Sequence, residues 1–531
     1  MWDRKAIRSG VKWVGLVGGP MAALICFFLL PTEYTAADGT LVLFTAAGRT
    51  TLAIMVWMAV WWLTEAMHIS VTALLPLAVF PLFGVASMDE AAAPYANKLI
   101  FLFFGGFMLA LSMQRWGLDR RIALMTLSRI GVQPAMMIAG FMLVTAFLSA
   151  FVSNTATTAM MLPIALSVIG LLDTNKKDPD ADEHAEDDQT AVDAAPEEEK
   201  NSTRAAHNFS TCLLLGIAYA ASVGGVATII GTPPNAVLVG FLRDTIDEPH
   251  RLDISMASWL LFGVPLAVVF LPIVWLLLTR FLFPVRDLKI AGARQLIQSQ
   301  LQGLGTAGRG ERITFCVFIV TATTWIMRPW LVKWTLPVAD GWRPLAGLSD
   351  AGIAMLAAIA LFVIPVNIRE VKFTLNWETA RRAPWGILIL FGGGLSLAAA
   401  VKDNGVAEFI GNQATFFSGA PTIVIVLIVC TAVIFLTELT SNVATTATLV
   451  PVLAAVAPGL ELHPYWLIFP ATLSASFAFM LPVATPPNAI VFGSGHVSIA
   501  QMAKAGLWLN LLGILVITAL TMLVIGPLLG I

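Results

Sequence analysis

The chain has 531 residues, of which 58% are hydrophobic and only 12% are charged. A soluble domain carries about 25% charged residues, so this composition excludes an ordinary soluble protein and predicts a polytopic, all-α integral membrane protein. The net charge of −2 does not bear on a nucleic-acid partner, but the absence of a Lys/Arg-rich run argues against one. The cysteines are isolated in apolar segments without CxxC or CxxH spacing, which argues against a metal site or a disulfide framework.

The first apolar segment, residues 12–30, follows the basic start MWDRKAIRSGVKW. It is long for the apolar core of a signal peptide, and more membrane segments follow, so we expect an uncleaved first helix with its basic end in the cytoplasm. Most later apolar segments have the ~17–25 residues that cross a bilayer core. They lie at 41–63, 70–86, 97–114, 208–242, 255–284, 312–332, 347–366, 384–400, 464–494 and 503–529.

Two further apolar segments, 133–170 and 421–457, are longer than one span and are interrupted by polar motifs. Two charged stretches separate apolar segments elsewhere. Residues 173–206 are acidic, lack aromatic residues and show no apolar periodicity, which predicts a disordered aqueous loop. Residues 285–311 form a basic stretch, which predicts a cytoplasmic loop by the positive-inside rule.

The second half of the chain repeats the first. SNTATTAMMLPIA from Ser153 is matched by SNVATTATLVPVL from Ser441, and GTPPNAVLVG from Gly231 is matched by ATPPNAIVFG from Ala484. A Gly-Gly motif precedes each Ser-Asn motif by the same interval, and the first copy is longer by about the length of the acidic loop. Repeats within a hydrophobic chain are typical of secondary transporters, usually with inverted topology.

The repeated Thr-Pro-Pro-Asn motifs predict discontinuous helices, broken around 231–235 and 484–488, because each proline pair removes two backbone donors. Non-helical backbone at membrane depth survives only inside protein or beside a water-filled cavity. The exposed N–H groups suit an anion, and the carbonyl and hydroxyl oxygens suit a hard cation such as Na⁺. No Lys or Arg lies in the motif-bearing segments 135–172, 208–242, 421–463 and 464–503, so a bound dianion would need co-bound cations as compensation.

A single polar block of this kind is equally consistent with hydrogen bonds between membrane helices. Two copies, each followed by a copied Thr-Pro-Pro-Asn motif, favour a binding site. Together with WWLTEAMHISVTALLPL at 61–77, these motifs resemble the divalent anion:sodium symporter family over nearly the whole chain. The resemblance implies about eleven transmembrane helices with two inverted repeats, two re-entrant hairpins and two broken helices, usually as a homodimer in which a transport part moves as an elevator.

The resemblance also implies the site. The substrate would be a small dianionic carboxylate, and two Na⁺ ions would bind beside it. Substrate contacts would come from Ser153, Asn154, Thr155, Thr232, Pro233, Ser441, Asn442, Val443, Thr485 and Pro486. The first sodium site would use Ser149, Ser153, Asn154 and Gly231, and the second would use Thr437, Thr440, Asn442 and Ala484.

The domain organisation follows the repeats. We expect N-terminal scaffold helices in 1–95, first-repeat transport elements in 96–245, scaffold helices in 246–383, second-repeat transport elements in 384–495 and a C-terminal helix in 496–531. The function that fits best is Na⁺-coupled symport of C4-dicarboxylates such as succinate, malate and fumarate, in lipid, with a bacterial inner membrane as the expected location. A Na⁺-independent dicarboxylate or citrate exchanger and a sulfate transporter of the same family remain alternatives.

Several features allow other interpretations. Val443 replaces the threonine of the second motif and removes one hydroxyl. Glu65-x-x-His68 resembles a metal pair, but a structural histidine is the simpler interpretation. Glu438 is either a proton or cation site or a structural acid. An intramembrane enzyme would need a nucleophile–base pair, and the Gly-Ser-Gly turn before His496 is weak support for one. A channel would differ from a transporter because its flux would not saturate with substrate concentration.

Overall fold

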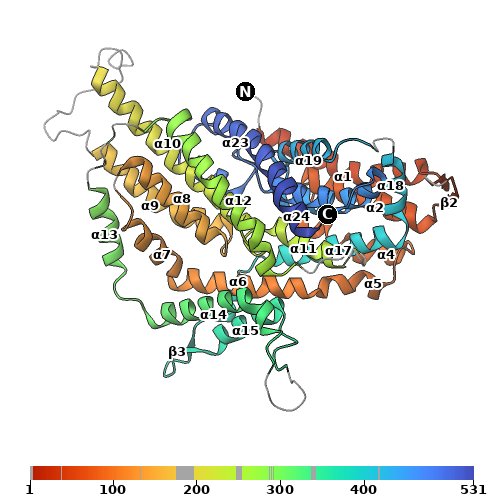
Figure 1. The fold of residues 1–531 in the computed structure, drawn as a ribbon, viewed down its shortest axis with the longest axis horizontal. Helices are drawn as coiled ribbons and strands as arrows, with labels where there is room; N and C mark the ends of the chain where they lie inside the picture. Colours follow the sequence, from red (N-terminus) through yellow and green to blue (C-terminus); the bar gives the residue numbers. More distant parts are fainter. Residues whose placement is uncertain are drawn as a thin grey trace.

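The computed structural model describes residues 4–36, 39–131, 133–174, 197–244, 246, 254–285, 288, 290, 292–335, 343–415 and 419–530. These residues form a mostly helical bundle, in which α8, α9, α10 and α12 lie side by side at one end and α1, α2 and α18 lie at the other (Figure 1).

The first half of the described chain runs through α1 (Arg4–Leu29), β1 (Glu33–Thr35), β2 (Leu41–Leu43), α2 (Ala46–Thr64), α3 (Ile69–Thr72), α4 (Leu75–Leu82), α5 (Met88–Ala92), η1 (Ala93–Ala96), α6 (Lys98–Trp116), α7 (Leu118–Leu127), α8 (Pro134–Ser149), α9 (Asn154–Thr174), α10 (Glu197–Val226), α11 (Pro233–Asp244), α12 (Met256–Leu276) and η3 (Leu277–Leu282).

The second half continues with α13 (Ala293–Gly303), α14 (Arg309–Leu331), α15 (Asp350–Val363), β3 (Pro365–Asn367), β4 (Lys372–Phe373), α16 (Trp377–Ala380), α17 (Trp385–Asp403), α18 (Val406–Ala414), α19 (Thr422–Thr437), α20 (Asn442–Val456), η5 (Ala457–Leu460), α21 (Tyr465–Ala475), α22 (Pro486–Phe492), α23 (Ile499–Leu520), η6 (Thr521–Ile525) and α24 (Gly526–Leu529). β1 pairs with β2 and β3 with β4, both antiparallel.

Ten helical segments in the described part of the chain are long and apolar enough to cross a membrane. This confirms the polytopic all-α class. Eight of the ten coincide with expected spans, and the other two, α9 and α20, lie in the two over-long apolar segments. Five shorter apolar helices accompany them, at Ile69–Leu82, Pro134–Ser149, Asp350–Val363, Thr422–Thr437 and Tyr465–Ala475. Several of these are short because they are arms of hairpins or halves of broken helices.

The two over-long apolar segments fold as helical hairpins, as the family resemblance implies. In the first, α8 and α9 meet at residues 150–153, and in the second, α19 and α20 meet at residues 438–441. The first arm of each hairpin packs along the helix that precedes a break, α8 on α10 and α19 on α21. Each polar motif therefore lies at the turn of a hairpin, which we call its tip.

The prediction for the acidic stretch 173–206 is wrong at both ends. The hairpin helix α9 continues to Thr174, and α10 begins at Glu197. Glutamates at the start of a helix are stabilised by its dipole, and the Glu, Lys, Arg and Ala residues that follow are good helix formers. Residues 175–196 of the predicted loop lie outside the described residues.

The basic stretch 285–311 is not entirely a loop either, because it contains α13. Ala293 and Ile297 are buried and lie four residues apart, so they share one helical face. That helix packs on α7 and α9, with Arg294 left exposed. A short amphipathic helix therefore occupies the middle of the predicted loop.

The repeated Gly-Gly motifs make the same packing contact in both halves. A methyl group on Gly105 of α6 would lie 2.5 Å from the carbonyl oxygen of Ala354 in α15. A methyl group on Gly393 of α17 would likewise overlap the carbonyl oxygen of Ala73, directly after α3. Glycine is needed at both positions because the neighbouring backbones approach closely.

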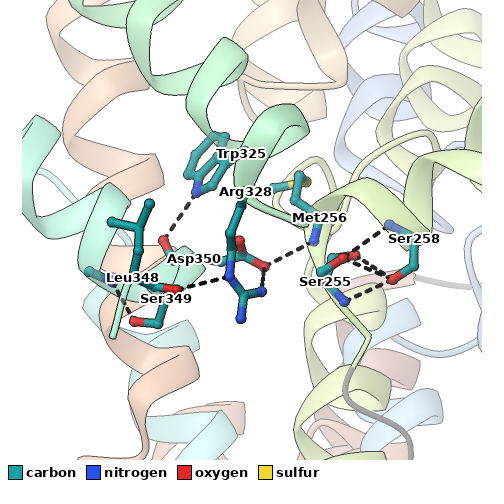
Figure 2. A network of polar contacts seen from close by, with 9 residues as sticks. Ser255, Met256, Ser258, Trp325, Arg328, Leu348, Ser349 and Asp350 are labelled. Carbon is teal, nitrogen blue, oxygen red and sulfur yellow. Dashed lines mark hydrogen bonds and ion pairs between the residues drawn. The ribbon is translucent and has the colours of Figure 1, made fainter. Parts of the chain in front are cut away.

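A polar network joins the ends of α12, α14 and α15 (Figure 2). It lies one helical turn before Ala354, the residue of α15 that contacts Gly105. Arg328 of α14 donates from Nη1 to Asp350 Oδ2 over 3.1 Å, and the same oxygen accepts from the Met256 backbone N–H at the start of α12 over 3.0 Å. Trp325 donates to the Asp350 carbonyl oxygen. The charged pair is mostly buried, so it fixes the mutual position of α12, α14 and α15.

We predict that Gly393→Ala destabilises the protein by about 1–3 kcal/mol, the usual cost of overpacking, because its methyl group meets backbone that cannot move aside. The adjacent Gly394 provides the matched control, since a methyl group there meets nothing within 4 Å. Thermal unfolding in detergent should show a lower midpoint for Gly393→Ala than for Gly394→Ala. Equal midpoints would contradict the close approach.

Candidate functional site

Each of the two broken helices is interrupted just before its proline pair. The first break spans residues 227–232, between α10 and α11, and the second spans residues 476–485, between α21 and α22. Pro233 and Pro486 are the first residues of the second half-helices, where a missing N–H costs nothing. The motifs therefore mark the breaks as predicted. The prolines themselves were expected to lie within the interruption, but in the structure they begin the next helix.

At the first hairpin tip, two acceptor oxygen atoms compete for one hydroxyl proton. Ser149 Oγ lies 2.6 Å from Asn154 Oδ1 and 2.7 Å from the carbonyl oxygen of Ala221 in α10. Thr228, within the first break, donates to the carbonyl oxygen of Ala150. Because the hydroxyl has one hydrogen for two acceptors, the cluster is rich in unshared electron pairs. Such an oxygen cluster suits a hard monovalent or divalent cation.

Glycines let the first break approach this cluster. A methyl group on Gly225 would lie 2.5 Å from Asn154 Oδ1, and one on Gly231 would overlap the Gly225 carbonyl oxygen and lie 3.0 Å from that of Ala150. The structure therefore brings together Ser149, Asn154 and Gly231, which the sequence assigned to one sodium site.

The second tip repeats the arrangement. Thr437 Oγ1 lies 2.9 Å from Asn442 Oδ1 and 2.9 Å from the carbonyl oxygen of Ala475, at the end of α21. Thr437 is fully buried, as is Ser149 at the matching position of the first half. Both halves thus place one hydroxyl between an asparagine oxygen and a backbone carbonyl oxygen beside a helix break.

The remaining residues assigned to the sodium sites are Ser153, Thr440 and Ala484, and they make other contacts. Ser153 is exposed and its Oγ accepts from the Ala156 N–H, so it caps the start of α9. The Thr440 hydroxyl lies against the Leu436 carbonyl oxygen and Thr445, away from the Thr437 cluster. Ala484 is buried within the second break.

The residues assigned to the substrate lie at the tips and at the starts of the half-helices. Thr155 is exposed, Ser441 and Asn442 are half-buried at the start of α20, and Thr232 is buried at the end of the first break. Thr485 is buried and accepts from the Asn488 N–H, while Pro233 is half-buried and Pro486 exposed. Val443 packs against an apolar cluster contributed mainly by α2, α17 and α18, so its methyl groups have an apolar environment.

Glu438, at the second tip, holds the second break in place. Its carboxylate accepts from the backbone N–H groups of Phe479, Met480 and Leu481 over 2.7, 2.9 and 3.1 Å, and from Asn510 Nδ2 over 2.8 Å. Four donors to one buried carboxylate support the structural interpretation of this acid. They also satisfy consecutive N–H groups that a broken helix leaves without helical partners.

The two halves of the site interlock. The second half-helix of each broken helix packs on the hairpin of the other repeat, α11 on α20 and α22 on α9. Tyr219 of α10 donates to the carbonyl oxygen of Phe479 in the second break over 2.9 Å. The two copies therefore form one connected site region.

The other candidate sites, the Glu65–His68 pair and the turn before His496, have structural explanations. The His68 ring accepts from the Ser70 N–H and caps α3, and Glu65 ends α2 in the left-handed region at φ 47°. The described residues contain no group of three or more His, Cys, Asp or Glu side chains that could hold a metal. The turn before His496 follows α22 and includes Gly495 at φ 79°, as expected for the end of a broken helix.

Sequence reasoning missed the residues that brace the breaks. Tyr219, Thr228 and Asn510 carry no repeat signal. Tyr219 and Thr228 donate to backbone carbonyl oxygens exposed by the local fold, and Asn510 donates to the Glu438 carboxylate. Asn235 and Asn488 were visible as the last residues of the repeated Thr-Pro-Pro-Asn motifs, but were given no role.

We predict that Glu438→Gln lowers the thermal midpoint in detergent, because an amide places an NH₂ group against backbone N–H donors, and an unpaired buried donor costs about 1–3 kcal/mol. Glu408→Gln, the same change at an exposed position of α18, should leave the midpoint unchanged. An unchanged midpoint for Glu438→Gln, with loss of the pH dependence of activity, would identify a titrating site instead.

Comparison with known proteins agrees with this architecture. The family model described as the sodium:sulfate symporter transmembrane region matches residues 12–531. A protein of Staphylococcus saprophyticus named sodium-dependent dicarboxylate transporter SdcS is 39% identical over 531 residues, covering 100% of this chain and 94% of the relative. The protein of that name from Staphylococcus aureus strain bovine RF122 is 38% identical, covering 99% and 94%.

Two solved structures share the fold at low sequence identity. The YdaH transporter of Alcanivorax borkumensis superposes with a TM-score of 0.58 at 13% identity, covering 98% of each chain. MtrF of Neisseria gonorrhoeae superposes with a TM-score of 0.55 at 10% identity, covering 97% of this chain and 94% of its own. Because the family model and the SdcS relatives match over essentially the whole length, the chain belongs to the sodium:sulfate symporter family of divalent anion:sodium symporters, which are membrane transporters and not enzymes.

Proposed function

We propose that this protein is a secondary active transporter that couples Na⁺ entry to the symport of C4-dicarboxylates such as succinate, malate and fumarate. One observation carries the proposal: each repeat places a buried hydroxyl between an asparagine oxygen and a carbonyl oxygen beside a helix break. Oxygen clusters of this kind are the ligands Na⁺ needs, and the relatives at 38–39% identity are named sodium-dependent dicarboxylate transporters.

The two oxygen clusters define the proposed sodium sites. The first is built on Ser149, Asn154 and Gly231, and the second on Thr437 and Asn442. The family resemblance adds Ser153 to the first site and Thr440 and Ala484 to the second. Na⁺ at each cluster would take the place of the missing hydrogen-bond donors. It would also supply positive charge in segments that contain no Lys or Arg.

The dianion would bind between the tips, after sodium. The helices α9, α11 and α20 begin at the tips or at the first break, and a helix N-terminus favours negative charge. The side chains of Ser153, Asn154, Thr155, Ser441, Asn442, Thr232 and Thr485, with the backbone near Pro233, Val443 and Pro486, are the proposed contacts. Sodium binding first would order both tips and complete the anion site, which couples the two fluxes.

The repeats are proposed to be inverted and to work as an elevator. If the hairpins do not cross the membrane, one broken helix and the helices α12, α14 and α15 separate α6 from α17. Four crossings then make α6 and α17 antiparallel, although they carry matching Gly-Gly contacts. The Asp350 network fixes α12, α14 and α15 to one another (Figure 2), which supports a rigid scaffold over 246–383.

The proposed location is a bacterial inner membrane, with the start of α1 in the cytoplasm. Arg115 bonds Asn376, Arg121 bonds Glu311 at the start of α14, and Lys372 lies over the Trp116 ring, so basic residues from two distant segments gather beside the turn between α6 and α7. An excess of basic residues marks the cytoplasmic side. We also propose, from the family resemblance, that the protein is a homodimer in lipid.

The direct test is radiolabelled succinate uptake into proteoliposomes under an imposed inward Na⁺ gradient. We expect uptake that saturates, needs Na⁺ and is inhibited by malate and fumarate more than by citrate or sulfate. Uptake without Na⁺ that requires internal dicarboxylate would identify an exchanger. Stronger inhibition by sulfate would identify a sulfate carrier, and flux that does not saturate would identify a channel.

In the same assay, Asn154→Ala and Asn442→Ala should each abolish uptake, because each removes one oxygen of a cluster. Asn208→Ala is the control, since Asn208 lies on α10 and donates to the Pro284 carbonyl oxygen, away from both breaks. Unchanged uptake by both site variants would refute the site assignment.

A further inference from the structure

The last residue of each Thr-Pro-Pro-Asn motif spans its helix break in the same way. Asn235 Nδ2 lies 2.8 Å from the carbonyl oxygen of Thr228 and 3.3 Å from those of Gly225 and Val226. One amide group of α11 thus bonds the end of α10 and the middle of the break. The side chain is fully buried, so these bonds are not shared with solvent.

Asn488 makes the matching contacts in the second repeat. Its Nδ2 lies 3.2 Å from the carbonyl oxygen of Ala478 and 3.1 Å from that of Leu481. Counted back from the asparagine, these acceptors occupy the same positions as Gly225 and Thr228 do from Asn235. Asn488 is also fully buried. The same clamp in both repeats, on different surrounding sequence, indicates a function that both halves need.

The first clamp acts on backbone that belongs to the proposed sodium site. Gly225, one of its acceptors, lies directly against the Asn154 amide, and its carbonyl oxygen lies directly against Gly231. Thr228, another acceptor, also bonds the Ala150 carbonyl oxygen through its hydroxyl. Any rotation of these peptide groups would therefore displace Asn154 and Gly231.

We propose that Asn235 and Asn488 are positioning residues that fix the backbone of the two breaks in the geometry required for sodium binding. The inference rests on the proposed function, because it takes the two oxygen clusters to be sodium sites. The donor Nδ2 is the essential atom: it neutralises carbonyl oxygens that would otherwise repel one another in a medium of low dielectric constant. Each asparagine Oδ1 is buried without a hydrogen-bond partner in the described part of the chain, which makes direct ligation of Na⁺ the competing explanation.

The substitution Asn235→Asp separates the two explanations, because it keeps an oxygen at Oδ1 and replaces the donor by a second oxygen. If Asn235 positions the break, this oxygen repels the three carbonyl groups and sodium binding weakens. If Oδ1 ligates Na⁺, the added negative charge maintains or strengthens binding. Asn235→Ser, which keeps a single hydroxyl donor, should lie between Asn235→Asp and the unaltered protein.

The measurement is the rise in thermal midpoint of the purified full-length protein with increasing NaCl, at constant ionic strength in choline chloride and without substrate. For Asn235→Asp and Asn488→Asp we expect the half-saturating Na⁺ concentration to rise about tenfold or more, the usual effect of losing a group that orients metal ligands. Asn208→Asp, on the same helix as the first clamp's acceptors, should behave like the unaltered protein.

A merely structural role would lower the midpoint in choline and leave the Na⁺ concentration dependence unchanged, and this result would overturn the inference. Unchanged or tighter Na⁺ binding by Asn235→Asp would overturn it in favour of ligation. If Asn235→Asp fails to fold, Asn488→Asp decides, because it makes the same change at the second break: a weakened Na⁺ dependence supports the inference, and an unchanged or stronger one contradicts it. If Na⁺ does not raise the thermal midpoint of the unaltered protein, the proposed sodium coupling itself fails. If only the inference fails, the unaltered protein still shows this rise.

Discussion

The structure depends on how backbone polar groups are paired at two helix breaks inside an apolar bundle. Each unpaired N–H or C=O group in a membrane interior costs several kcal/mol, so a break is stable only where side chains or ligands replace the lost helical bonds. Asparagine amides, the hydroxyls at the hairpin tips and the Glu438 carboxylate supply most of this pairing. The oxygen clusters around Ser149 and Thr437 each have one hydroxyl proton for two acceptors, and this is where we place Na⁺.

The two halves satisfy this constraint differently. The second break is held by Glu438 through consecutive N–H groups and by Tyr219 from α10. The first break has Ala150 at the position that matches Glu438, and Thr228 bonds its carbonyl oxygen. Both breaks are bonded by an asparagine amide. In addition, a buried carboxylate braces the second break and the Thr228 hydroxyl braces the first. The two repeats therefore share the arrangement of the site but differ in local charge.

The repeated Thr-Pro-Pro-Asn motifs made the breaks predictable from sequence, and the family resemblance implied the hairpins and the residues of both oxygen clusters. Helix ends within charged segments were less predictable: Glu197 begins a helix, and Ile297 lies on a buried face in a stretch expected to be a loop. The main-chain partners of Glu438 and Asn235 were not predictable, because the availability of these backbone atoms depends on where the helix stops. A proline pair predicts a break nearby, but the proline itself is accepted in the first turn of the next helix.

The most direct test of the account is a high-resolution cryo-electron microscopy map of the full chain in lipid with NaCl and succinate. The account predicts density for Na⁺ at each break, within coordination distance of the Asn154 and Asn442 side-chain oxygens, and succinate between the two hairpin tips. Succinate bound elsewhere, or cation density at neither asparagine, would contradict the claim that the repeated breaks form one sodium-dependent anion site.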